Sequence, residues 1–131
     1  MNPGTPALPV KLGIREGMTV VLVNTPDGFT LELPDGVDLR RQARGKVDVV
    51  LAFFVKRSEL ERRIAVLEKA VYPDGALWVA WPKRASGVET DLSDHAVREV
   101  SLPDGLVDNK VCAVDETWTG LRLVWRLEHR H

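Results

Sequence analysis

An unbroken apolar run extends from Val49 to Val55, directly after Asp48. Such a run is typical of a strand covered on both faces, as in the centre of a parallel sheet. Apolar residues then recur at helical spacing as far as Val71, and a second apolar strand pattern covers residues 76–81. A strand, a crossover helix and a second buried strand predict a right-handed βαβ unit over residues 48–82.

The helix of this unit is predicted over residues 58–71, with its apolar stripe inward and its charged residues in solvent. Ser58 and Glu61 have the spacing of a capping box, in which each side chain binds a free backbone N–H group. Pro-Asp-Gly ends the helix at residues 73–75 and recurs at 34–36 and 103–105. In each tripeptide we expect proline to preset φ and glycine to take a positive φ.

The rest of the chain predicts shorter elements around this unit. Residues 18–24 and 37–39 have strand patterns, residues 29–33 allow a short helical segment, and Asp91 caps a helix from Leu92 to about Leu102. Strands over 110–115 and 121–127 are joined only by residues 116–120, so they must be antiparallel neighbours. We expect the strand order 37–39, 18–24, 48–55, 76–81, 121–127, 110–115.

These elements predict a single α/β domain over residues 1–131. Its expected fold is a three-layer Rossmann-like sandwich with a mixed, mostly parallel sheet and a C-terminal antiparallel hairpin. Residues 1–11 are rich in proline, so we expect an extended N-terminal arm there.

Composition adds few constraints on function. The chain has 131 residues, 44% of them hydrophobic and 28% charged, as in an ordinary soluble globular protein. A net charge of -1 argues against nucleic acid and against an anionic membrane surface as partners. No apolar stretch is long enough for a membrane span, and no secretory signal precedes the domain, so we expect a cytoplasmic protein. Cys112 lies in an apolar run and is expected to be a small buried hydrophobe.

Ligands of open α/β sheets bind beyond the carboxyl ends of the parallel strands. Loops at these ends predict a site for a small anionic ligand, with Lys83 as the leading cation, Lys56 beside it, and a helix opening near Gly28. The alternative is that these cations are solvated charges beside helix starts. Asp27 and Asp91 are candidate general bases, although helix capping explains both equally well. The candidate ligand-binding residues are Asn24, Thr25, Asp27, Gly28, Lys56, Lys83, Thr90 and Asp91.

Other chemistry-bearing side chains have weaker patterns. His95 has no second ligand at helical spacing, and His129 and His131 lie in the chain terminus, so no metal site is expected. Trp118 lies in the connection between the last two strands, where it either folds back over the sheet edge or covers a partner. With Arg122 and Arg126 on the outer strand, it forms a candidate surface for a protein partner or a second copy.

The order of elements, and the phrase Ala70-Val-Tyr-Pro-Asp-Gly-Ala-Leu-Trp-Val79, resemble the second half of the Rossmann-like S-adenosylmethionine-dependent methyltransferases. In that family a Gly-x-Gly loop follows the first strand, and the second strand ends in an acidic residue for the ribose. Here the first position has Asn24-Thr-Pro-Asp-Gly28 and the second is reduced to Val37-Asp38-Leu39. These departures argue against S-adenosylmethionine, so we expect no cofactor.

A second resemblance covers most of the chain. The segments Asn24-Thr-Pro-Asp-Gly-Phe29, Ala76-Leu-Trp-Val-Ala-Trp-Pro-Lys83 and Val111-Cys-Ala-Val-Asp-Glu-Thr-Trp118 are similar to a family of small bacterial proteins known only as a domain of unknown function. The resemblance implies a bacterial protein and no particular activity.

The sequence lacks a nucleophile and base pair, metal-ligand spacing and a glycine-rich phosphate loop. We therefore expect a non-catalytic binding or regulatory domain for a small anionic ligand or a protein partner. The alternative is an enzyme derived from the methyltransferase-like fold, with Asp27 or Asp91 as base and Lys83 holding a small acidic substrate.

Overall fold

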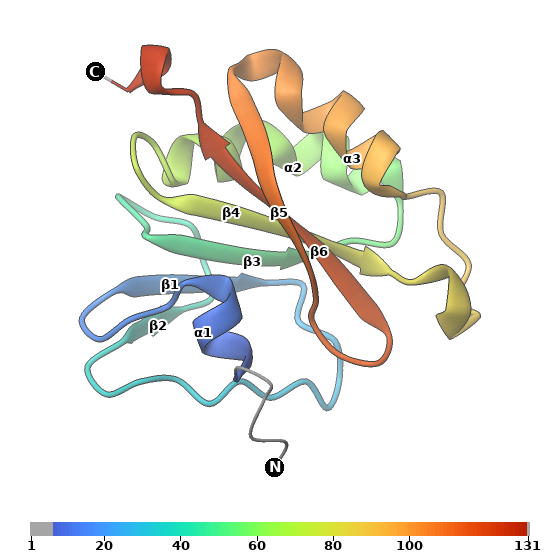
Figure 1. Cartoon of the computed structure of the whole chain (residues 1–131), viewed down its shortest axis with the longest axis horizontal. Coiled ribbons are helices and arrows are strands. Elements are labelled where there is room, and N and C mark those ends of the chain that lie inside the picture. The colour runs from blue at the N-terminus through green and yellow to red at the C-terminus, as the bar shows by residue number, and fades with distance from the viewer. Residues whose placement is uncertain (1–6, 131) are drawn as a thin grey trace.

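The computed structural model describes residues 7–130, which form a twisted sheet with helices on both faces (Figure 1). Within these residues the sheet has six strands in the order β2-β1-β3-β4-β6-β5. Strands β2, β1, β3 and β4 are parallel, and β6 is antiparallel to both of its neighbours. The predicted mixed sheet and its strand order are confirmed. The strands are β1 (Thr19–Val23), β2 (Asp38–Arg40), β3 (Val49–Phe53), β4 (Ala76–Pro82), β5 (Leu106–Ala113) and β6 (Trp118–Trp125).

The C-terminal hairpin begins earlier on each strand than its sequence pattern predicts. β5 starts at Leu106 and its register shifts between Asp108 and Lys110, where a bulge interrupts the pairing with β6. The polar stretch at the bulge breaks the apolar alternation, because β5 is an exposed edge strand. Leu127, expected inside the last strand, lies beyond β6 in a short 3-10 turn, η3 (Leu127–His129), and is 80% exposed.

One face of the sheet is covered by two helices, α2 (Arg57–Ala70) and α3 (Asp94–Ser101), which lie side by side in Figure 1. Their apolar side chains pack on inward residues of β3, β4 and β6 in one continuous core. The inward residues of α2 include Leu60, Ile64 and Leu67, as the helical spacing predicts. Two further 3-10 turns, η1 (Arg84–Ser86) and η2 (Leu102–Asp104), flank α3.

The opposite face is covered by one short helix and by extended chain. The predicted extended arm is wrong for residues 8–11, because α1 (Leu8–Leu12) is helical and Gly13 ends it at φ 79°; residues 1–6 of the arm lie outside the described residues. The helical segment expected over residues 29–33 is also wrong. Phe29, Leu31 and Leu33 alternate with exposed residues and pack on the sheet. The crossover from β1 to β2 therefore contains no helix.

Both predicted caps of the two long helices are wrong. α2 begins at Arg57, before Ser58, and no side chain of its own N-cap residue binds its N-terminus. α3 begins at Asp94 and is capped by Ser93, whose Oγ accepts a hydrogen bond from the N–H of Ala96 at 3.1 Å.

The three Pro-Asp-Gly tripeptides end their segments in two different ways. Gly36 and Gly105 have positive φ, at 75° and 114°, as predicted. Gly75 does not, so the positive-φ prediction is wrong there. A Cβ at Gly75 would lie 2.6 Å from the backbone oxygen of Val47 and 2.9 Å from that of Asp48. Glycine is needed at this position because α2 ends directly against the chain that enters β3.

No helix within residues 7–130 is long and apolar enough to cross a membrane.

Candidate functional site

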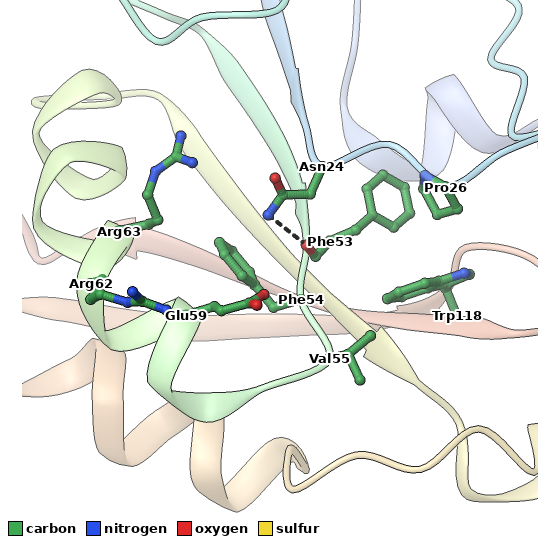
Figure 2. Close-up of a pocket in the computed structure, with 9 residues that line it drawn as sticks. All are labelled: Asn24, Pro26, Phe53, Phe54, Val55, Glu59, Arg62, Arg63 and Trp118. Atoms are coloured by element: carbon green, nitrogen blue, oxygen red, sulfur yellow. Dashed lines mark hydrogen bonds between the residues drawn. The ribbon is translucent and has the colours of Figure 1, made fainter.

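A pocket of about 530 Å³ lies at the carboxyl ends of β1 and β3, beside the first turns of α2 (Figure 2). β2 and β3 pair with β1 on opposite sides, so this is the point where the strand order reverses and where ligands of open α/β sheets bind. Its lining residues are Asn24, Pro26, Phe53, Phe54, Val55, Glu59, Arg62, Arg63 and Trp118.

Asn24 closes the crevice between the two strand ends. It follows β1 directly and has φ 55°, a left-handed conformation that asparagine tolerates better than most residues. Its Nδ2 donates a hydrogen bond to the backbone oxygen of Phe53, the last residue of β3, at 3.1 Å (Figure 2). The exposed side chain therefore lines the pocket and bridges the ends of β1 and β3.

Phe53 and Trp118 form the apolar side of the site, and Phe29 packs behind Phe53 without lining the pocket. Phe53 is fully buried and contacts Phe29 and Trp118 edge to face, with ring centroids 5.0 and 5.1 Å apart. Trp118 is the first residue of β6, on a strand that is not adjacent to β3. Of the two alternatives for Trp118, folding back over the sheet matches this contact. Its half-exposed ring adds an aromatic wall to the pocket.

The polar side of the pocket comes from α2. Glu59, Arg62 and Arg63 lie on successive positions of one helix face and line the pocket opposite the aromatic rings (Figure 2). Among the described residues, neither arginine side chain makes a hydrogen bond or ion pair. Two guanidinium groups against one carboxylate leave this wall positively charged, and guanidinium is a preferred donor to carboxylate and phosphate.

The loop after β1 contributes a turn and no helix. The N–H of Phe29 donates to the backbone oxygen of Pro26 at 3.1 Å, with Asp27 exposed at the turn and Gly28 at φ 80°. The expected helix N-terminus near Gly28 is therefore wrong. Thr25 Oγ1 accepts a hydrogen bond from Arg41 Nη1 at 3.0 Å, which ties this loop to the end of β2.

Three other candidate residues lie together around the start of α2, at a neighbouring shallow pocket of about 390 Å³. Lys56 is exposed there, and Thr90 Oγ1 donates to the backbone oxygen of Val55. Asp91 Oδ1 accepts from the backbone N–H of Arg57 at 2.7 Å. Thr90 and Asp91 thus attach the loop after β4 to the loop after β3, and Asp91 caps α2 where the sequence predicted that it caps α3.

Lys83 does not line the 530 Å³ pocket. Its Nζ donates to the backbone oxygen of Asp115 at 2.6 Å, and its N–H donates to the backbone oxygen of Thr117. Lys83 therefore stabilises the β5–β6 turn.

The three candidate partner-binding residues are spread along β6 and just beyond it, and their role in binding a partner stays a prediction. Trp118 begins β6 and Arg126 follows its end, so ~26 Å of strand separates them at about 3.3 Å per residue. Arg122 lies half-buried between them and donates to Asn109 Oδ1 at 3.1 Å. Burial and the nearby Arg130 lower the pKa of Arg122.

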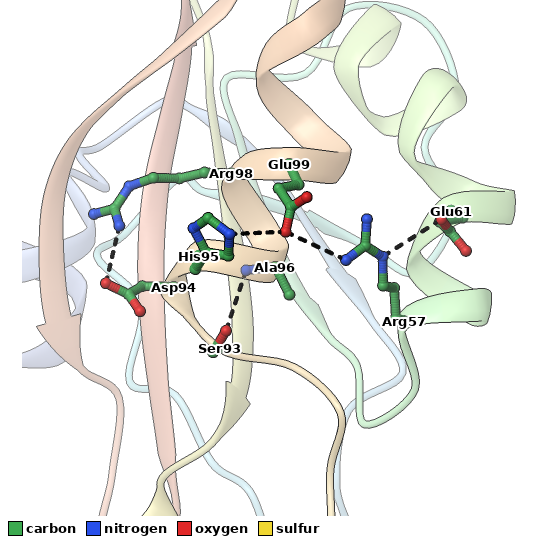
Figure 3. A network of polar contacts seen from close by, with 8 residues as sticks. All are labelled: Arg57, Glu61, Ser93, Asp94, His95, Ala96, Arg98 and Glu99. Atoms are coloured by element: carbon green, nitrogen blue, oxygen red, sulfur yellow. Dashed lines mark hydrogen bonds and ion pairs between the residues drawn. The ribbon is translucent and has the colours of Figure 1, made fainter.

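A network of ion pairs links α2 to α3 (Figure 3). The guanidinium of Arg57 lies 3.5 Å from Glu61 and 3.6 Å from Glu99, and Glu99 also lies 3.0 Å from His95 Nε2. His95 is exposed, so it belongs to this surface network. His129 contacts the Trp125 ring, and His131 lies outside the described residues. No group of three metal-binding side chains occurs in the part of the chain that the structure describes.

Seven of the nine lining residues were not among the sequence-based candidates: Pro26, Phe54 and Val55, and the four that form the two walls, Phe53, Glu59, Arg62 and Arg63. The apolar run assigns Phe53 to the core, and the helical pattern assigns the other three to solvent. The helical spacing of Glu59, Arg62 and Arg63 was visible, but which neighbour this face meets depends on the crossing of α2 over β3.

No protein-family model matches the chain, and no curated protein does. Solved structures do match. A SAM dependent methyltransferase from Aquifex aeolicus is 17% identical, with a TM-score of 0.65 over 87% of this chain and 85% of that one. A putative type 11 methyltransferase from Sulfolobus solfataricus is 13% identical, with a TM-score of 0.58 over 95% of both chains. Ribosomal protein L11 methylase from Lactobacillus delbrueckii subsp. bulgaricus is 14% identical, with a TM-score of 0.53 over 91% of this chain and 75% of that one.

These similarities establish the Rossmann-like methyltransferase fold. The resemblance to a bacterial family of unknown function stays a prediction.

S-adenosylmethionine does not fit the residues at the matching position. The cofactor approaches backbone after the first strand in this fold, but here the Asn24 side chain fills that place and binds the end of β3. The ribose needs a carboxylate at the end of the second strand, whereas β2 ends in Arg40 and continues into Arg41. The carboxylate that β2 does carry, Asp38, is paired with Arg40 at 2.7 Å, and the positive charge of Arg62 and Arg63 is unfavourable for a sulfonium group.

Proposed function

We propose that this chain is a bacterial, cytoplasmic binding domain for a small anionic molecule with an apolar part. The anionic group pairs with Arg62 and Arg63, and the apolar part lies against Phe53 and Trp118. The domain works as a non-catalytic sensor or regulatory module that keeps the methyltransferase-like fold without its cofactor chemistry.

The observation that carries the proposal is a pair of arginine side chains on the wall of a pocket at the strand-order reversal, neither of which has an ion partner in the described part of the chain. Arginine binds carboxylate and phosphate through two parallel hydrogen bonds, which gives geometric selectivity as well as charge. The half-exposed Trp118 ring adds apolar contact area, and apolar walls with a few polar groups are the usual composition of a small-molecule site. No carboxylate or histidine in the pocket pairs with a nucleophile, so the described residues favour binding over catalysis.

A methyltransferase-type enzyme is the second candidate, and the fold of the solved neighbours favours it. In that case S-adenosylmethionine binds the crevice at Asn24, and Glu59 is the one carboxylate among the residues that line it. The two candidates differ in the charge of the ligand, because the first requires an anion and the second a sulfonium cation.

The test is isothermal titration calorimetry with phenyl phosphate, phenylacetate, adenosine monophosphate, S-adenosylmethionine and S-adenosylhomocysteine. We expect an aromatic anion to bind and Arg62→Gln or Arg63→Gln to weaken it about tenfold, the value of one lost charge-assisted contact. Arg15→Gln is the matched control, since Arg15 is exposed at the opposite end of the sheet.

Two results count against the proposal. If S-adenosylmethionine binds and the anions do not, the enzyme is the better assignment. If the anions bind equally well to the Arg62, Arg63 and Arg15 variants, the pocket is not their site.

A further inference from the structure

A second pocket, of about 420 Å³, lies at the opposite end of the sheet from the proposed anion site. It is formed where α2 ends, where η2 follows α3, and where β6 ends. β6 is antiparallel to β4, so its last residue, Trp125, lies near the amino ends of the parallel strands. The lining residues are Ala65, Glu68, Lys69, Tyr72, Asp104 and Trp125.

Glu68 is the unusual residue of this pocket. It is on the last full turn of α2 and only 2% exposed, yet its Oε1 has no hydrogen-bond partner among residues 7–130. A buried polar atom without a partner costs about 1–3 kcal/mol, so such atoms are rare in native structures. Because Glu68 lines the pocket, a donor bound there could satisfy Oε1.

A second carboxyl group, that of Asp104 on η2, lies beside Glu68. Burial first, and then a side-chain hydrogen bond with Asp104 and the negative charge of Asp104, raise the pKa of Glu68 to about 9. Glu68 therefore holds a proton at neutral pH, and Asp104 carries the negative charge of the pair.

Aromatic side chains complete the walls. Trp125 Nε1 donates to the backbone oxygen of Glu68 at 2.9 Å, which fixes the indole over the end of α2. The Tyr72 ring contacts the indole edge to face, with centroids 5.4 Å apart. Faces of tryptophan and tyrosine attract organic cations, and this attraction grows when water is excluded.

We propose that this pocket binds a small organic cation, a primary ammonium or guanidinium group on an apolar stem, with Glu68 and Asp104 as its counter-ions. The N–H groups of the cation donate to Glu68 Oε1, and the stem lies against Trp125 and Tyr72. When the cation binds, Glu68 releases its proton to solvent. One positive charge enters the site and one leaves, so the net charge of the site is the same before and after binding.

Other titratable and charged groups face the same pocket. Lys69 lines it from α2, but its side chain is exposed and its charge is screened by water. His129 on η3 lies beside Trp125, with ring centroids 6.4 Å apart. A pH dependence of binding that disappears in Glu68→Gln is therefore assigned to Glu68, because this variant leaves Lys69 and His129 unchanged.

The test is calorimetric titration of the full chain with n-butylammonium and n-butylguanidinium at pH 7, 8 and 9, where both probes stay cationic. We expect binding at millimolar concentration or tighter, and affinity that rises up to tenfold per pH unit as the proton on Glu68 becomes easier to displace. Titration at pH 7 in buffers of different ionisation enthalpy should show about one proton released per cation bound. n-Butanol is the uncharged control and should not bind.

Glu68→Gln is the decisive variant, because glutamine has the shape of a protonated glutamate and keeps the fold. We expect it to lose at least tenfold in affinity and all proton release, and Asp104→Asn to weaken binding. Glu61→Gln, an exposed position on the same helix, should bind like the natural chain. Absence of binding, an affinity independent of pH, or equal binding to Glu68→Gln would each overturn the proposal. None of these variants touches Arg62 or Arg63, so the outcome is independent of the anion site.

Discussion

The carboxylate of Asp91 accepts a hydrogen bond from the backbone N–H of Arg57 at 2.7 Å, although 34 positions separate the two residues. The first N–H groups of a helix lack partners within the helix, and a carboxylate there also interacts favourably with the helix dipole. The loop after β4 thus supplies the cap that the chain before α2 lacks. The Arg57 side chain then continues the link to α3 through Glu99.

Asp91→Ala should lower the free energy of unfolding by about 0.5–2 kcal/mol, the usual cost of a lost helix cap. Asp91→Asn should retain most of the stability of the natural chain, because asparagine also caps well. Urea unfolding followed by circular dichroism measures both. Asp27→Ala, at an exposed turn, is the control and should change stability by less than about 0.5 kcal/mol. An equal effect of the two alanine substitutions would contradict the capping role.

Ser93→Ala should destabilise the protein by about 1 kcal/mol, because the Ser93 hydroxyl caps α3. Ser58→Ala should be nearly neutral, since Ser58 lies inside α2 and caps nothing. The same urea titrations compare the two serines directly. If Ser58→Ala lowered the free energy of unfolding more than Ser93→Ala does, the capping-box prediction would be correct and the observed start of α2 would be wrong.

Gly75→Ala should cost more than about 2 kcal/mol, because its Cβ would meet two backbone oxygens that cannot move independently of β3. Gly87→Ala is the matched control. Gly87 has φ 78°, and a Cβ added there would have no atom within 4 Å, so only the backbone conformation is penalised, by about 1 kcal/mol. If both substitutions lowered the free energy of unfolding equally, the close approach of the Gly75 Cβ to the backbone oxygens would not be the cause.

Stability should depend on pH through Glu68. Its folded pKa of about 9 lies above its value of 4.5 in an exposed chain, so the folded state keeps a proton that the unfolded state releases. The stabilisation of the folded state by this proton is complete below pH 4.5 and is lost as pH rises towards 9. The free energy of unfolding then falls by at most about 1.4 kcal/mol per pH unit. Glu68→Gln removes the dependence, so the variant should gain stability relative to the natural chain between pH 5 and 8. A constant difference between the two proteins across this range would show that the pKa of Glu68 is not raised.

Glu59→Gln should strengthen binding of an aromatic anion severalfold. Glu59 is the one carboxylate among the residues lining the anion pocket, and its removal leaves Arg62 and Arg63 unopposed. Calorimetric titration with phenyl phosphate at low and high salt measures the effect, which should diminish at high salt. Weaker binding after the substitution would mean that Glu59 holds a positive group of the ligand.

Sequence patterns alone were sufficient to predict the strand order of the sheet and the directions of its strands. The order β2-β1-β3-β4-β6-β5 follows from the apolar runs, the right-handed crossover and the short hairpin connection. Each of these depends on local periodicity or on connection length, which are visible along the chain. The face of α2 that carries Leu60 and Leu67 was predictable for the same reason.

Only the tertiary structure decided how residues distant in sequence meet. Asp91 at Arg57, Trp118 on Phe53 and Asp104 beside Glu68 each join side chains from different elements, and composition or spacing does not encode such contacts. Arg62 and Arg63 have the same pattern as any solvent-facing pair of a helix. They become a pocket wall because the packing of α2 on the sheet brings them to the carboxyl ends of β1 and β3. Helix and strand periodicity are local properties of the backbone, whereas a site is formed by the crossing of elements, which depends on the packing of the whole core.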